Sequence, residues 1–200
     1  KAFVHRPALD IHTFGTQQRD WLLQSDLITP TWRNAWEAAC AKALQMVQDA
    51  MHETLYKSLR LHGDCHPGNV LWTPIDLPQG GPHFVDLDDA RTGPAIQDLW
   101  MLLSGEPQER QRQLHAMLEG YESFANFDWR ELQLIEPLRT LRILHHSAWL
   151  ARRWADPAFP AAFPWFGSSA YWAEQTQLLR QQIELMGEAG APPEIDSSDW

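Results

Sequence analysis

Hydrophobic residues follow a helical period over the stretch that begins at residue 31. Apolar side chains recur there at steps of three and four, which is the spacing of one buried helix face. They are Trp32, Ala35, Trp36, Ala39, Ala43, Leu44, Met46 and Val47. The pattern predicts a long helix that ends between residues 51 and 58. Residues 1–30 show no sustained period of 2 or 3.6, so an irregular lead-in is expected there.

Short β-leaning runs replace the helical pattern after residue 58. Residues 59–61, 69–72 and 83–86 are bounded by glycine and proline, which predicts small strands in a loop-rich unit. The segment 74–82 between the second and third runs is rich in Pro and Gly, so we expect an exposed hairpin connection.

Helical patterns return after Pro94. Prolines at first-turn positions and glycine at a capping position predict helices near 94–105, 107–124, 129–154 and 169–186. Pro137 predicts a kink or a late start in the third of them. Residues 31–186 are thus expected to form one domain of a predominantly helical α+β fold, and the Pro-, Ser- and acid-rich residues 187–200 a flexible tail.

The amino-acid composition excludes several classes of protein and of binding partner. The 200 residues include 16 basic and 26 acidic side chains, a net charge of −10, 44% hydrophobic residues and 11 Trp. A chain of this kind folds around a core. Its evenly spread negative charge argues against nucleic acid and anionic membranes as partners. The two cysteines, Cys40 and Cys65, favour a reducing compartment, and a cytoplasmic monomer is expected.

Polar residues with catalytic potential are concentrated in two short stretches, 62–69 and 84–89. The first reads His-Gly-Asp-Cys-His-Pro-Gly-Asn, and the second reads Phe-Val-Asp-Leu-Asp-Asp. The order H-x-D-x-x-x-x-N, followed by a strand that ends in Asp, is typical of phosphoryl transfer in kinases. There an aspartate orients the acceptor hydroxyl, while the asparagine and the later aspartate hold Mg²⁺ against the ATP phosphates. The pattern predicts these roles for Asp64, Asn69 and Asp86.

Residues 61–72 and 84–103 resemble the aminoglycoside-phosphotransferase-like kinases, and within that superfamily the bacterial stress-response kinase A group of Ser/Thr protein kinases. The likeness extends to 135–139 and 148–160. It implies the C-terminal, large lobe of a protein kinase-like fold, with a small antiparallel hairpin that carries the catalytic loop. It also implies ATP as co-substrate, Mg²⁺ as cofactor and a Ser or Thr hydroxyl on a protein as the acceptor.

The resemblance assigns a role to each residue of the motif. Asp64 would be the catalytic base, while Asn69 and Asp86 would bind magnesium, which makes Asp86 part of the catalytic set. Asp88 is a further candidate metal contact. Two residues would support the catalytic loop structurally: His62 and Asp98. In this scheme 62–69 is the catalytic loop, 84–89 the metal-binding segment and 94–186 a helical subdomain.

Two departures from the kinase pattern carry expectations of their own. Gly63 occupies the position of the arginine that reads activation-loop phosphate in eukaryotic kinases, so that mode of control is not expected. A kinase also needs a strand lysine and a glycine-rich flap to hold ATP. Neither Lys1, Lys42 nor Lys57 lies in such a context. The N-terminal ATP-gripping lobe is therefore expected to be absent, with most ATP contacts outside this chain and negligible turnover by the chain alone.

Other interpretations of the same residues stay open at this point. The acceptor is alternatively a small molecule of the aminoglycoside, choline or homoserine type, or the chain is a non-catalytic partner-binding module. His62, Asp64 and His66 alternate as the ligands of a metal site do. Asp86-Leu87-Asp88 resembles the nucleophile of haloacid-dehalogenase phosphatases. The tryptophans between 100 and 172 favour helix packing over a carbohydrate- or choline-type cage.

Overall fold

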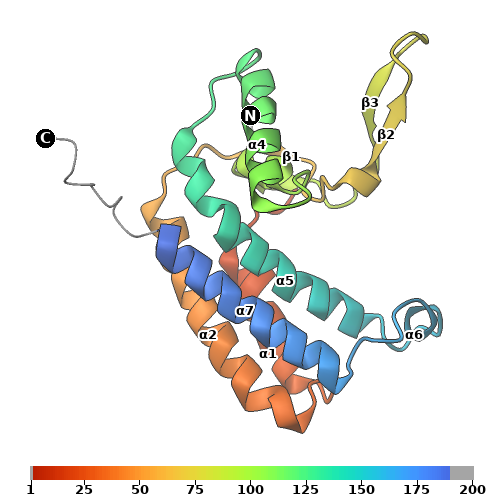
Figure 1. Ribbon diagram of the computed structural model, residues 1–200. Helices are drawn as coiled ribbons and strands as arrows, with labels where there is room; N and C mark the ends of the chain where they lie inside the picture. Colours follow the sequence, from red (N-terminus) through yellow and green to blue (C-terminus); the bar gives the residue numbers. More distant parts are fainter. Residues whose placement is uncertain (1, 190–200) are drawn as a thin grey trace, which may run out of the picture. The chain divides into compact units, whose positions relative to one another are not determined.

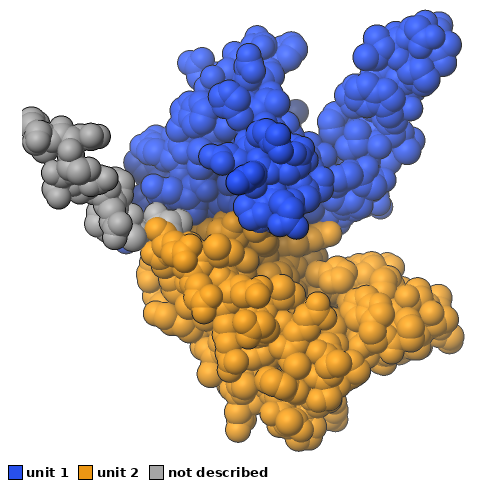
Figure 2. Space-filling model, in the orientation of Figure 1, with its two compact units in different colours: residues 1–10, 53–135 blue, residues 11–52, 136–200 orange. Residues whose placement is uncertain are grey.

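The computed structural model describes residues 2–189 and shows a mostly helical fold with small sheets (Figure 1). The chain divides into two compact units, coloured separately in Figure 2. Unit 1 comprises residues 1–10 and 53–135, and unit 2 comprises residues 11–52 and 136–200. Unit 2 contains η1 (His12–Thr16), α1 (Gln17–Gln24), α6 (Ala158–Ala162), α7 (Ser169–Ala189) and nearly all of α2 (Pro30–Glu53) and α5 (Ile135–Arg152). Unit 1 contains β1 (Leu59–Leu61), η2 (Pro67–Asn69), β2 (Val70–Thr73), β3 (Gly81–Phe84), β4 (Arg91–Gly93), α3 (Ile96–Trp100), α4 (Pro107–Glu122) and η3 (Trp129–Leu134).

Unit 2 is built on the apolar face that the helical period predicted. Trp36 of α2 is 1% exposed and meets the buried Trp172 of α7 edge to face, with 5.7 Å between ring centroids. The indole N–H of Trp172 donates to the carbonyl of Leu27 at 2.7 Å, so this large buried ring keeps its polar atom bonded. The core is completed by buried leucines of α5 and α7: Leu138, Leu141, Leu144, Leu150 and Leu179.

The expectation of an irregular segment over residues 1–30 is wrong for residues 12–24, which form η1 and α1. The buried positions there are Gly15, Gln18 and Leu22. Their spacing is that of one helix face. Because Gly15 has no side chain and Gln18 is polar, the sequence shows no hydrophobic period over this helix. A Cβ atom on Gly15 would lie 2.5 Å from a methyl carbon of Leu44. The face is therefore selected by close packing.

The three predicted strands and the hairpin of unit 1 are confirmed in their order, with one added strand. The third strand covers 81–84, and not 83–86 as expected, so Asp86 lies beyond its end. β2 and β3 pair antiparallel from Val70↔Phe84 to Thr73↔Gly81, across the Pro- and Gly-rich connection. β4 has no counterpart among the predicted strands, and it pairs antiparallel with β1, from Leu59↔Gly93 to Leu61↔Arg91. Residues 62–69 therefore join two separate two-stranded sheets, which corrects the expectation that one hairpin carries this loop.

The helices after residue 94 agree with the prediction in their order. α5 begins at Ile135, so Pro137 lies in its first turn and η3 precedes it, which is the late start that this proline predicted. α6 has no predicted counterpart. α7 continues to Ala189, so residues 187–189 are helical and not part of a tail, while the rest of the expected tail, 190–200, lies outside the described residues.

The two units do not follow the boundary expected at residue 31. Chain segments far apart in sequence combine in each unit, so the division cannot be seen in local composition. Within residues 2–189, no helix has both the length and the hydropathy that crossing a membrane requires.

Candidate functional site

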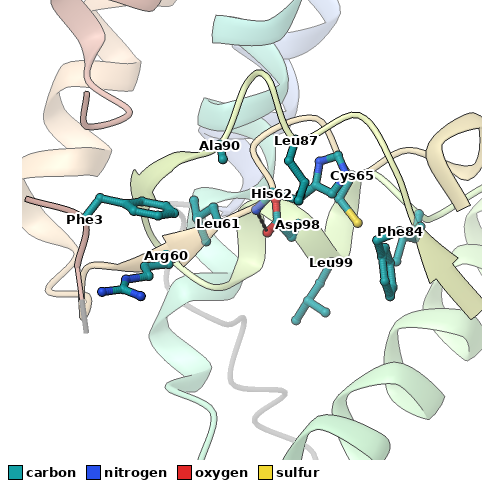
Figure 3. Close-up of a pocket in the computed structure, with 11 residues that line it drawn as sticks. Phe3, Arg60, Leu61, His62, Cys65, Phe84, Leu87, Ala90, Asp98 and Leu99 are labelled. Atoms are coloured by element: carbon teal, nitrogen blue, oxygen red, sulfur yellow. Dashed lines mark hydrogen bonds between the residues drawn. The ribbon is translucent and has the colours of Figure 1, made fainter. Parts of the chain in front are cut away.

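Asp98 of α3 holds the start of the loop 62–69 through its carboxylate. Its Oδ2 accepts from the backbone N–H of His62 at 2.6 Å (Figure 3). Its Oδ1 accepts from the backbone N–H of Gly63 at 2.9 Å. Burial raises the pKa of the Asp98 carboxyl above its usual range, and the two backbone donors oppose that rise. One carboxylate thus fixes two consecutive amides at the point where β1 ends.

His62 connects this loop to the segment that carries Asp86. The side chain is buried, and its Nε2 lies 2.8 Å from the carbonyl oxygen of Val85. A carbonyl can only accept, so Nε2 carries the hydrogen and Nδ1 is left to accept from the Asp64 N–H at 3.4 Å. Because the backbone engages both ring nitrogens, the structure argues against His62 as a metal ligand.

Asp64 and Asn69 are held in one hydrogen-bonded turn. The carbonyl of Asp64 accepts from the His66 N–H at 2.9 Å and from the Asn69 Nδ2 at 3.0 Å. The carbonyl of Asn69 in turn accepts from the Val85 N–H at 3.0 Å, which extends the β2–β3 pairing by one residue. The Asp64 carboxylate is half-buried, with its Oδ2 at 3.7 Å from the His66 Nε2. The structure therefore links residues 64, 69 and 85 through the side-chain amide of Asn69 and through backbone groups.

Gly63 is required by the loop geometry. Its φ is +87°, and a Cβ atom built on it would lie 2.2 Å from the carbonyl oxygen of Asp89 and 2.9 Å from the Nε of Arg91. The buried Arg91 donates through Nε to that same Asp89 carbonyl and through Nη2 to the Asp89 carboxylate, both at 2.7 Å. The loop 62–69 and the segment 84–89 thus pack backbone against backbone at this glycine.

Asp86 has an uncommon backbone conformation for a residue with a side chain. Its φ is +62°, it lies two residues beyond the end of β3, and its side chain is exposed. Left-handed residues other than glycine cost roughly 1–3 kcal/mol and concentrate at functional sites. Asp88 and Asp89 are also exposed, and Arg6 donates to the Asp88 carbonyl at 2.7 Å.

A cavity of about 440 Å³ lies beside this hydrogen-bonded frame (Figure 3). Its walls are mostly apolar, and two of them, Phe84 and Leu87, remain 52% and 56% exposed. The lining includes Leu61, His62, Cys65, Phe84, Leu87 and Asp98. The low polarity of these surroundings is consistent with the burial that raises the pKa of Asp98. Burial also raises the pKa of the Cys65 thiol to about 11, and the nearby Asp98 and Asp64 carboxylates raise it further. Cys65 is therefore not an activated nucleophile.

The side chains suit Mg²⁺ in their chemistry. Mg²⁺ is held by one or two protein carboxylates, with water and substrate phosphates completing its shell. The side-chain nitrogen of Asn69 donates to the Asp64 carbonyl, so the side-chain oxygen of Asn69 can serve as a metal ligand. Asp86 provides an exposed carboxylate. No cluster of three or more His, Cys, Asp or Glu residues within 2–189 has the arrangement of an all-protein metal site, which argues against the His62, Asp64 and His66 triad.

Three residues that support the site were not found from the sequence: Arg91, Glu131 and, in its steric role, Gly63. Glu131 is 2% exposed, and its carboxylate accepts from the Ile96 N–H at 3.0 Å and from the amides of Ala95 and Lys57. It therefore caps the helix that carries Asp98. The only sequence signal was an acidic residue within an otherwise helical stretch, which is usually a solvated position.

Residues 5–135 match the phosphotransferase enzyme family, APH. The chain belongs to this family, whose match covers every residue of the candidate site. This family membership removes the haloacid-dehalogenase alternative for residues 86–88.

Individual relatives carry kinase names. Stress response kinase A of Escherichia coli O157:H7 is 45% identical over 186 residues, which are 93% of this chain and 55% of the relative. The serine/threonine protein kinase RdoA of Salmonella typhimurium is 43% identical over 188 residues, which are 94% of this chain and 55% of the relative. The chain thus spans about half the length of the curated relatives it matches.

Among solved structures, a spectinomycin phosphotransferase in complex with ADP and spectinomycin aligns with a TM-score of 0.49 and 15% sequence identity. The alignment covers 88% of this chain and 56% of that protein.

Proposed function

We propose that this chain carries the catalytic half of an ATP- and Mg²⁺-dependent kinase that phosphorylates Ser or Thr hydroxyls on a protein. The observation that carries the proposal is the hydrogen-bonded frame of unit 1, in which Asp98 and His62 bind the loop of Asp64 and Asn69 to the segment of Asp86. Membership of the phosphotransferase family and the kinase names of the relatives support it. The Ser/Thr acceptor rests on the name of one such relative.

Each residue of the proposed catalytic set has a role that follows from its position. The Asp64 carboxylate, half-buried at the start of the loop, orients the acceptor hydroxyl and takes its proton. The Asn69 side-chain oxygen and the Asp86 carboxylate would hold Mg²⁺, with Asp88 as a further contact. When bound, the metal neutralises the charge that develops on the transferred phosphoryl group. Asp98 and His62 hold the loop so that this set stays in place.

Substitution of Asp64 in the longer protein that contains this segment tests the proposal. We expect Asp64→Asn and Asp86→Asn to lower the rate of phosphate transfer from labelled ATP by about 10²- to 10⁴-fold, since general base or metal contacts would be lost. Asp76→Asn is the matched control, because Asp76 is an exposed carboxylate in the β2–β3 connection. If Asp64→Asn keeps more than half of the activity, the catalytic assignment is wrong, and a partner-binding module gains support.

The acceptor is tested separately. The longer protein is incubated with labelled ATP and either a denatured protein mixture or small alcohols of the aminoglycoside, choline and homoserine types. The proposal expects acid hydrolysis of the protein fraction to release phosphoserine or phosphothreonine. Label that appears only on a small alcohol would overturn the protein acceptor and leave the phosphotransferase chemistry standing.

A further inference from the structure

Residues 2–9 run along β4 and are attached to it near both of their ends. The backbone N–H of Leu9 donates to the carbonyl of Thr92 at 2.7 Å, and the N–H of Thr92 donates to the carbonyl of Pro7 at 3.0 Å. Nearer the start, the N–H of Phe3 donates to the Oγ1 of Thr92 at 3.1 Å. The buried Thr92 therefore holds the backbone on both sides of the residues between Phe3 and Pro7.

Arg60 of β1 gives the start of this segment a further contact. Its Nε donates to the carbonyl of Ala2 at 3.4 Å. Its guanidinium lies beside the ring of Phe3, with 5.2 Å between the guanidinium carbon and the ring centroid (Figure 3). A guanidinium at this distance from an aromatic face is attracted by the ring. The path of residues 2–9 is thus determined by contacts outside the stretches that carry the proposed catalytic residues.

Arg6 extends from this segment to the metal-binding segment 84–89. Its Nη1 donates to the carbonyl oxygen of Asp88 at 2.7 Å, and the two residues are 82 positions apart in the sequence. Hydrogen bonds with a charged donor are shorter and roughly twice as strong as neutral ones. A residue outside both stretches of proposed catalytic residues thus holds the backbone of the second one.

Asp86 lies between two backbone groups that other parts of unit 1 hold. On one side, the N–H of Val85 donates to the carbonyl of Asn69 at 3.0 Å, and the Val85 carbonyl lies 2.8 Å from the Nε2 of His62. On the other side is the Asp88 carbonyl with its guanidinium donor. A left-handed backbone at a residue other than glycine persists only where the surrounding structure imposes it. Both attachments therefore contribute to the φ of +62° at Asp86.

The carbonyls on either side of Asp88 have donors that are close in sequence. The Leu87 carbonyl accepts from the N–H of Ala90 at 3.1 Å, and the Asp89 carbonyl accepts from the Nε of Arg91 at 2.7 Å. These bonds shape a local turn, but they do not attach it to another part of the chain. The carbonyl of Asp88 differs, because its donor comes from a segment distant in sequence.

We infer that Arg6 is a positioning residue of the proposed metal site. By holding the Asp88 carbonyl, it keeps Asp86 in the left-handed conformation that leaves its carboxylate exposed for a divalent cation. Residues of this kind orient metal ligands without touching the metal. The inference rests on the proposed function, because it takes Asp86 as a ligand of Mg²⁺.

The charge of Arg6 and its hydrogen bond have opposite effects on a bound cation. A guanidinium repels Mg²⁺, so an effect of the charge alone would make removal of Arg6 strengthen metal binding. Loss of the hydrogen bond releases the Asp88 carbonyl and with it the conformation of Asp86, so a positioning role makes removal of Arg6 weaken metal binding. The direction of the change therefore decides between the two effects.

Binding of Mn²⁺ to the longer protein that contains this segment tests the inference, because the EPR signal of the free ion measures binding without catalysis. Arg6→Met keeps the length of the side chain but neither donor nor charge, and it is expected to raise the dissociation constant for Mn²⁺ about tenfold. Arg6→Lys keeps a charged donor and should stay within about threefold of the parent. Arg112→Met is the matched control, because Arg112 is exposed on α4 and donates to Glu109. It should leave Mn²⁺ binding unchanged.

The Mg²⁺ dependence of phosphate transfer gives a second measurement. At saturating ATP, the Mg²⁺ concentration for half of the maximal rate should rise about tenfold in Arg6→Met, while the rate at saturating Mg²⁺ falls less than about twofold. The urea midpoint should equal that of the parent, because the bonds of Thr92 still hold residues 2–9. A lower midpoint with an unaltered Mg²⁺ requirement would show that Arg6 only stabilises the fold.

Asp86→Asn distinguishes failure of this inference from failure of the proposed function, because it should abolish most of the Mn²⁺ binding. If it does, and Arg6→Met binds Mn²⁺ as tightly as the parent or more tightly, the inference is overturned while the metal site stands. An Arg6→Lys protein that binds as weakly as Arg6→Met would also contradict the inference. If Asp86→Asn binds Mn²⁺ like the parent, the metal assignment itself is wrong, and the role of Arg6 is wrong with it.

Discussion

Gly63 shows at the scale of a single residue how the site constrains the sequence. Its left-handed φ and the Asp89 carbonyl beside it leave no place for a Cβ atom. In the sequence, Gly63 occupies the position of the arginine that reads activation-loop phosphate in eukaryotic kinases, and only the loss of that function was expected from it. The structure gives Gly63 a steric role as well, since the two segments that carry the proposed catalytic residues approach each other there through their backbones.

Gly63→Ala is expected to lower the free energy of unfolding by roughly 2–4 kcal/mol, from left-handed strain and overlap with backbone. Urea denaturation measures it. Gly120→Ala is the matched control, because Gly120 lies in α4 with nothing within 4 Å of a built Cβ. That variant should gain about 0.5–1 kcal/mol from helix propensity. A Gly63→Ala protein as stable as the parent would mean that the loops separate without cost.

Asp98 provides a prediction about pH. Burial raises its folded-state pKa above the unfolded value of about 3.9. The folded state therefore binds the proton more tightly, so the contribution of Asp98 to stability is complete below pH 4 and is lost as pH rises through the folded pKa. The difference in unfolding free energy between the parent and Asp98→Asn should fall across this window. A difference that grows with pH would show that the two amide donors outweigh burial.

At the scale of secondary-structure elements, the segments of the proposed catalytic site are positioned by short helices and strands that have little stability of their own. α3 spans only five residues, and the strands three or four each. Such elements need partners, because an isolated helix shorter than about 12 residues is marginal in water. Glu131 supplies one partner from η3 by accepting hydrogen bonds from the start of α3 and from the residue-57 amide ahead of β1.

Removal of the Glu131 carboxylate should therefore loosen several elements together. Glu131→Ala leaves buried amides without an acceptor, and a loss of about 2–4 kcal/mol in unfolding free energy is expected. Glu131→Gln keeps one acceptor and should lose about 1 kcal/mol. Glu119→Ala, at an exposed position of α4, should stay within about 0.5 kcal/mol of the parent. Similar stability of all three variants would show that α3 does not depend on this cap.

At the scale of the whole molecule, every residue of the proposed catalytic set lies in unit 1. The four strands within the described residues, 59–61, 70–73, 81–84 and 91–93, contain no lysine to hold ATP phosphates. This supports the proposal that the 200-residue chain needs further residues for phosphoryl transfer.

The purified 200-residue chain is expected to turn over Mg-ATP at less than about 1% of the rate of the longer protein, because positioning of the phosphates supplies much of the catalysis. The measurement is phosphate transfer from labelled ATP with the same protein acceptor for both. Circular dichroism of the chain serves as the control that it is folded. Robust phosphorylation by the 200-residue chain would contradict the proposal that it needs further residues for phosphoryl transfer.

The sequence by itself determined the elements whose signals are local. The long helix α2, the β2–β3 hairpin, the order of the later helices and the late start at Pro137 follow from periodicity and from proline and glycine positions. The order of His62, Asp64, Asn69 and Asp86 predicted the phosphotransferase class, which the family match supports; their individual roles remain a proposal. Each of these signals is contained within one short stretch of chain.

Only the tertiary structure decided what depends on residues distant in sequence. The helical segment 12–24 depends on close packing of Gly15 against Leu44 of α2. β4 depends on its pairing with β1, some 30 residues earlier in the chain. Arg91 and Glu131 look like ordinary surface charges in the sequence, yet both are buried. Arg91 lies beside Gly63 and donates to Asp89, and Glu131 accepts from the backbone N–H of Ile96 in another segment. A charge becomes structural only when the fold removes its water and supplies other partners, and that exchange is decided in three dimensions.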